Sequence, residues 1–65
     1  MGPPPLERLA DVARALRDAD PTLLDSRHLF RAAVERQVLS DGHGPPRQAD
    51  LDAVVAAAYL TRRRP

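Results

Sequence analysis

One stretch decides the fold of this chain: residues 48–63, QADLDAVVAAAYLTRR. Its apolar residues recur at the three- and four-residue spacing of a helix. Aspartates lie in its first turns and arginines at its end, which is the order that the helix dipole favours. We therefore predict a helix over residues 48–63, with a core-facing stripe of Leu51, Val54, Val55, Ala58 and Tyr59.

The opposite side of this helix is also nearly apolar, because it carries Ala53, Ala56, Ala57 and Leu60. A helix that is apolar all round is expected to be buried on more than one side. In a chain of 65 residues, two other helices cannot easily wrap a third. Two interpretations stay open. Either a second copy or another protein covers these four residues, or they are exposed to water. Exposure is the simpler interpretation for the alanines, because Ala is the best helix former and is common on protein surfaces.

Two further helices are predicted upstream, over residues 5–19 and 26–40. Pro5 suits the first position of a helix, and Pro21 disfavours helical geometry in the residue before it. The first helix has the stripe Leu6, Leu9, Ala10, Ala13 and Leu16, with Val12 at its margin. The second helix has the stripe Leu29, Phe30, Ala33, Val34, Gln37, Val38 and Leu39.

The breaks between the helices differ in clarity. Residues 40–46 hold two glycines and two prolines, which predicts a helix end followed by a loop. Residues 21–24 form either a loop with two apolar anchors, Leu23 and Leu24, or a first helical turn capped by Asp20. We favour the loop, with Asp25 or Ser26 capping a helix that starts later.

The fold class is therefore all-α, a small three-helix bundle. A proline-rich arm, residues 1–4, precedes a single domain over residues 5–64. Such a short chain has a thin core, and it has no cysteine for a disulfide. Completion of the bundle by dimerisation or by a partner protein is therefore an open alternative to a self-sufficient fold.

Chemistry of its own is not expected of this chain. His28 and His43 lie on different elements without acidic residues at metal-binding spacing, and Ser26 and Ser40 lack the setting of a nucleophile. We therefore predict no catalytic residue, no metal, no cofactor and no small-molecule substrate, and we expect that the chain is not an enzyme. No apolar run reaches membrane-spanning length and no signal peptide is evident, so a cytoplasmic location is the default expectation.

The charges give two weaker hypotheses. Net charge is +1, and all ten basic residues are Arg, which is typical of a GC-rich bacterial genome. Arg27 and Arg31, one helical turn apart, could bind a carboxylate or phosphate of a partner, or they could belong to a solvated face. Asp11 with Arg14, Arg14 with Asp18, and Arg31 with Glu35 stand at ion-pair spacing.

A small DNA-binding regulator that uses Arg62, Arg63 and Arg64 is the alternative function. The loop over residues 41–47 is longer than the turn of a helix-turn-helix motif, and Asp50 and Asp52 would oppose docking on phosphates. We therefore expect a protein–protein interaction module or accessory subunit. Its docking residues would be Ala53, Ala56, Ala57, Leu60, Arg27 and Arg31, and its partner a larger protein or a second copy.

Overall fold

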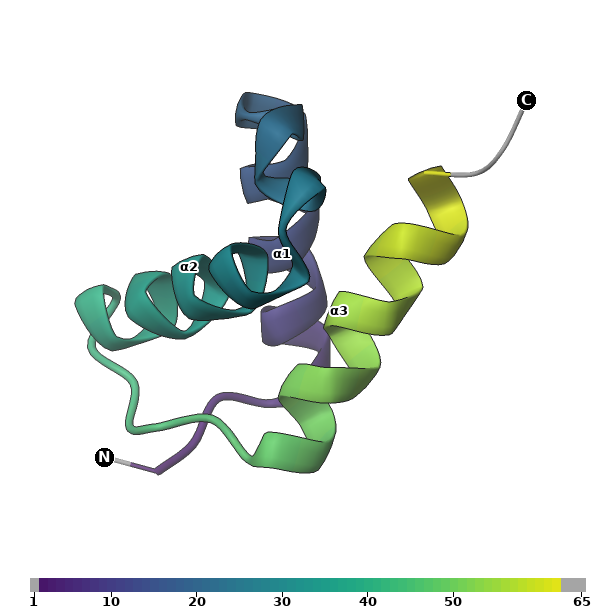
Figure 1. Ribbon diagram of the computed structural model, residues 1–65. Coiled ribbons are helices and arrows are strands. Elements are labelled where there is room, and N and C mark those ends of the chain that lie inside the picture. The colour runs from purple at the N-terminus through teal and green to yellow at the C-terminus, as the bar shows by residue number, and fades with distance from the viewer. Residues whose placement is uncertain (1, 63–65) are drawn as a thin grey trace.

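The structure confirms the predicted small three-helix bundle. The computed structural model describes residues 2–62, with side chains as far as residue 60, and this range contains three α-helices and no strand. The elements are α1 (Leu6–Ala19), a short 3-10 helix η1 (Pro21–Asp25), α2 (Arg27–Ser40) and α3 (Gln48–Arg62). In Figure 1, α2 lies across α1 while α3 runs along it, and each α-helix contacts the other two. The predicted bounds hold to within a residue, except that residue 63 lies outside the described range.

The connection between α1 and α2 is more regular than predicted. Residues 21–25 form a 3-10 helix instead of a loop, because the Asp20 side chain accepts a hydrogen bond from the Thr22 N–H at 3.2 Å. Pro21 fits the first position of this 3-10 helix, because the backbone N–H that proline lacks would have no partner within the helix there. The late start of α2 is confirmed, since the Ser26 hydroxyl accepts from the Leu29 N–H at 3.3 Å.

The end of α2 is fixed by a glycine. Gly42 has a φ of 95°, and its N–H donates to the Leu39 carbonyl oxygen at 3.1 Å, while the His43 N–H donates to the Val38 carbonyl oxygen at 3.1 Å. These two bonds form a Schellman motif. The following loop lies beside the N-terminal arm (Figure 1), where the Gly44 N–H donates to the Gly2 carbonyl oxygen at 3.0 Å.

One core joins the three helices and η1. It consists of Leu9, Val12, Ala13, Leu24, Phe30, Val34, Val38, Leu51, Val54, Val55 and Ala58. The stripe predicted for α3 is confirmed, with Tyr59 half-buried at its edge. Val12, placed at the margin from the sequence, belongs to the core.

The stripe predicted for α2 is too wide. The buried residues of this helix are Phe30, Val34 and Val38, which follow one another at four-residue spacing along a single line. Leu29 and Leu39 are 59% and 47% exposed. The reason is that α2 crosses the other helices (Figure 1), so that only one narrow line of its residues is buried against them.

Candidate functional site

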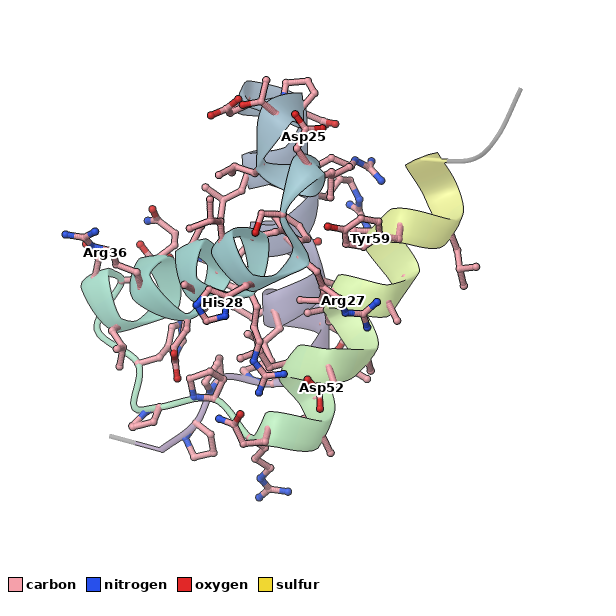
Figure 2. The ribbon with its side chains drawn as sticks, in the orientation of Figure 1. Asp25, Arg27, His28, Arg36, Asp52 and Tyr59 are labelled. Atoms are coloured by element: carbon pink, nitrogen blue, oxygen red, sulfur yellow. The ribbon has the colours of Figure 1, made fainter. Side chains whose placement is uncertain are left out.

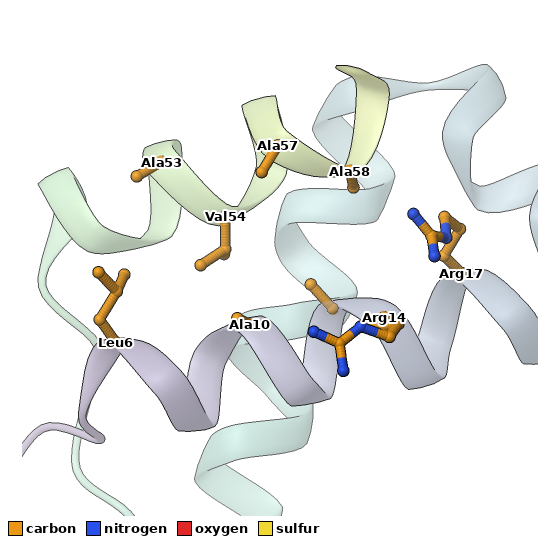
Figure 3. A pocket seen from close by; sticks show the side chains of 9 residues that line it. Leu6, Ala10, Arg14, Arg17, Ala53, Val54, Ala57 and Ala58 are labelled. Atoms are coloured by element: carbon orange, nitrogen blue, oxygen red, sulfur yellow. The ribbon is translucent and has the colours of Figure 1, made fainter. Parts of the chain in front are cut away.

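A shallow groove of about 300 Å³ lies between α1 and α3. Figure 3 shows that the two helices run in the same direction along it, so that Leu6 lies near Ala53 at one end and Arg17 near Ala58 at the other. Its lining is mainly apolar: Leu6, Ala10, Ala13, Arg14, Arg17, Ala53, Val54, Ala57 and Ala58.

Small side chains make up more than half of the lining of the groove, since five of its nine residues are alanines. The side chain of alanine ends at a methyl group, so these positions leave the space above them unfilled. Ala13, Val54 and Ala58 are almost fully buried and form the floor, whereas Ala53 and Ala57 are exposed on the rim. The floor is therefore part of the core, and the rim is open to solvent.

The apolar rim continues along α3 from Ala53 and Ala57 to Leu60, and the half-buried Asp50 precedes it. Asp50, Ala53, Ala57 and Leu60 follow at spacings of three, four and three residues, which places them on one side of a helix. Leu60 is 69% exposed and Leu6, at the start of α1, is 50% exposed. We call the groove together with Asp50 and Leu60 the α1/α3 face.

Two arginines supply the positive charge at this face. Arg14 and Arg17 line the groove from α1, and each has a carboxylate nearby, with Arg14 Nη1 3.5 Å from Asp11 Oδ1 and Arg17 Nε 3.5 Å from Asp18 Oδ1. Both ion pairs are long, and both carboxylates are exposed, so the pairs contribute little stability. The guanidinium group of Arg14, whose side chain is 62% exposed, can therefore turn toward another carboxylate at small cost.

Only some of the residues predicted for docking lie at the α1/α3 face. Ala53 and Ala57 line the groove, and Leu60 lies on the same side of α3. Ala56 is half-buried instead, since it shares the side of α3 that carries Asp52 and Tyr59, and that side contacts α2.

Arg27 and Arg31 are directed at α3 within the same chain. The Arg27 guanidinium carbon lies 5.6 Å from the centre of the Tyr59 ring. Arg31 forms an ion pair with Asp52 and a hydrogen bond to the Gln48 side chain. Figure 2 shows Arg27, Tyr59 and Asp52 along the junction of α2 and α3. These arginines are thus not part of the groove, and Arg31 pairs across to α3 rather than with Glu35.

The α1 wall of the groove was missed from the sequence. Helical spacing places Leu6, Ala10 and Ala13 on the predicted buried stripe of α1, and it places Arg14 and Arg17 outside that stripe. A sequence signal existed only in part, because the small side chains of α1 and of α3 were visible but their juxtaposition was not. That juxtaposition depends on how the two helices cross.

A second hollow, between α1 and α2, has a more polar lining. Half of its residues are charged or amide-bearing, namely Arg8, Asp11, Gln37 and Asp41, and the others are Val12, Ala15, Leu16 and Ala19. Water solvates such a surface well, so this hollow is a weaker candidate for protein docking than the α1/α3 face.

The two histidines do not line the groove. His28 is exposed on α2 and His43 is half-buried in the loop after it, and no group of metal-ligating side chains is found in the part of the chain that the structure describes. Arg63 and Arg64 lie outside the described residues, as does the side chain of Arg62. Within residues 2–62, none of the helices has the length and apolar character to cross a lipid bilayer.

Comparison with known proteins gives no relative. No protein-family model, no curated protein and no solved structure matches this chain. Function is therefore inferred from the geometry of the α1/α3 face alone.

Proposed function

We propose that this chain is a helical protein–protein interaction module or accessory subunit, which acts by recognition and has no chemistry of its own. The observation that carries the proposal is the α1/α3 face, where an apolar groove meets two exposed leucines, Leu6 and Leu60. An exposed apolar surface of this kind, bordered by charged residues, is typical of protein-binding sites.

The chemistry of the face suits the approach of another helix. Alanines at the rim allow helix axes to come near the lower end of the usual range, about 8 Å. Burial of a leucine side chain stabilises a complex by up to about 1.5 to 3 kcal/mol, and here one leucine stands at each end of the face. Ala53, Ala57 and Leu60 therefore stay at the centre of the proposal.

Arg27 and Arg31 have a different role in the proposed function. Their contacts with Tyr59 and Asp52 join α2 to α3, and α3 carries one wall of the groove. We therefore propose that the two arginines support the docking surface from behind rather than contact the partner.

Ala57→Glu tests the proposal, because it places a charged side chain on the groove rim. The matched control is Ala32→Glu, which changes an exposed alanine of α2 outside the groove. Both variants should remain helical by circular dichroism, since neither alanine is buried. We expect association, measured as self-association by sedimentation and as capture of a partner from the native host, to be lost in Ala57→Glu and kept in Ala32→Glu.

The proposal is wrong if the wild-type chain neither self-associates nor captures a partner, or if both variants behave as the wild type does. A cytoplasmic location belongs to the same proposal. Fractionation of the native host, followed by detection of the chain, would contradict it by finding the protein outside the cytoplasm.

A further inference from the structure

The α1/α3 face has a defined polarity. Since α1 and α3 run in the same direction, Arg14 and Arg17 lie toward the end of the groove formed by Ala58, and Leu6 lies at the end formed by Ala53 (Figure 3). Asp50, which is half-buried, precedes Ala53 by one helical turn on the same side of α3. The face therefore bears the Asp50 carboxylate near one end and two guanidinium groups near the other, while the carboxylates beside those arginines, Asp11 and Asp18, are not part of the groove lining.

Such a face is complementary to itself when it is turned around. In a two-fold arrangement with the two α3 helices antiparallel, Asp50 of one copy comes level with Arg14 and Arg17 of the other. The same operation repeats the contact on the opposite side of the axis, so both carboxylates meet basic groups. In a parallel arrangement the arginines would face arginines, which like-charge repulsion disfavours.

The same two-fold arrangement brings the exposed leucines of the two copies together. Leu6 lies at the Ala53 end of the groove, and Leu60 lies two turns beyond Ala53 toward the other end of α3. Antiparallel packing brings Leu60 of one copy to Leu6 of the other, and Ala57 of one copy to Ala53 of the other. The most exposed apolar side chains of this face then cover one another, and the close contact falls on methyl groups.

We propose that the occupant of the α1/α3 face is a second copy of this chain, packed across a two-fold axis with antiparallel α3 helices. This inference rests on the proposed function and names its partner. The dimer joins two apolar grooves into one core and adds ion pairs between Asp50 and the Arg14–Arg17 pair at both ends.

A dimer of this kind is held by a modest surface. The stretch of α3 from Asp50 to Leu60 is about 15 Å long at 1.5 Å per residue, so the interface falls at or below the standard size of stable complexes. We therefore expect a dissociation constant in the micromolar range, and the measurement should run from about 5 µM to about 1 mM.

The test is a charge exchange followed by analytical ultracentrifugation. One variant is Asp50→Arg, and the other is the double variant Arg14→Glu with Arg17→Glu. In a homodimer of either variant, like charges meet at both ends of the interface, so self-association should weaken about tenfold or more. In an equimolar mixture every contact is between opposite charges, and association should return to the wild-type level.

The controls separate charge exchange from unfolding and from a general effect of acidic substitutions. Circular dichroism should show each variant as helical as the wild type, and Ala32→Glu should dimerise as the wild type does. Recovery in the mixture is itself a control, because two variants that had merely unfolded would not restore each other.

Two results would overturn the inference: a wild-type chain that stays monomeric to about 1 mM, or a mixture that associates no better than its separate components. The proposed function fails separately. If the chain is monomeric yet captures another protein that Ala57→Glu loses and Ala32→Glu retains, the second copy is excluded and the interaction module stands.

Discussion

The hydroxyl group of Tyr59 donates a hydrogen bond to the carbonyl oxygen of Leu24 at 2.7 Å, which joins α3 to η1 across 35 positions of the chain. The same ring meets the edge of Phe30 with centroids 6.4 Å apart and an interplanar angle of 85°. Tyr59 thus connects the last helix to both elements of the middle of the chain, and it holds α3 in the place where its outer side forms the groove.

Tyr59→Phe is expected to lower the free energy of unfolding by about 0.5 to 1.5 kcal/mol, which is the usual net contribution of one hydrogen bond. The substitution keeps the ring, so the contacts with Phe30 and Arg27 remain. Urea denaturation of both proteins measures the difference. An unchanged midpoint would mean that water replaces the Tyr59 hydroxyl group at the Leu24 carbonyl oxygen without a loss of stability.

Phe30→Ala is expected to be the most damaging single change, because Phe30 is the largest of the fully buried side chains. Such truncations cost about 3 to 5 kcal/mol, while a domain of this length has a total stability of roughly 3 to 10 kcal/mol. We expect the variant to be largely unfolded at room temperature by circular dichroism. The neighbouring Leu29→Ala is the control, since Leu29 is mainly exposed and its loss should change stability by less than about 0.5 kcal/mol.

These residues also show what the sequence could predict. The stripe of Leu51, Val54, Val55 and Ala58 was found correctly, because helical periodicity is a local property and a buried stripe on one helix repeats in the sequence itself. Leu29 and Phe30 are both apolar neighbours, yet one is exposed and the other buried. Only the crossing of α2 over the other helices separates them, and that crossing is encoded in no local pattern.

The candidate site follows the same rule. The exposed alanines of α3 were identified by their spacing, whereas the wall supplied by α1 depends on the tertiary arrangement. The partner of Arg31 illustrates the difference, since helical spacing indicated Glu35 and the structure gives Asp52 on α3. Spacing within one helix predicts contacts only when no other helix offers a better partner.

The ion pair between Arg31 and Asp52 should contribute little despite joining two helices. The side chains are 33% and 58% exposed, so water screens their attraction. A double-mutant cycle with Arg31→Ala and Asp52→Ala should give a coupling energy of about 0.2 to 1 kcal/mol, reduced at high salt. A coupling well above this range, or one that salt leaves unchanged, would show that the pair is shielded from solvent.

Gly42→Ala tests the end of α2, where the φ of 95° lies in the region that L-residues rarely adopt. A side chain there costs roughly 1 to 2 kcal/mol, whereas replacing glycine stabilises by only about 0.4 to 1 kcal/mol through the unfolded chain, so the strain prevails. An added Cβ would touch nothing within 4 Å, which leaves the backbone as the cause of any loss. Thermal denaturation should show a lower Tm for Gly42→Ala than for the wild type. The decrease should be smaller for Gly42→Asn, because asparagine tolerates a positive φ better. The control Gly2→Ala should leave the Tm almost unchanged, since its added Cβ also meets open space. Equal Tm values for Gly42→Ala and Gly2→Ala would show that α2 can end without the Schellman motif.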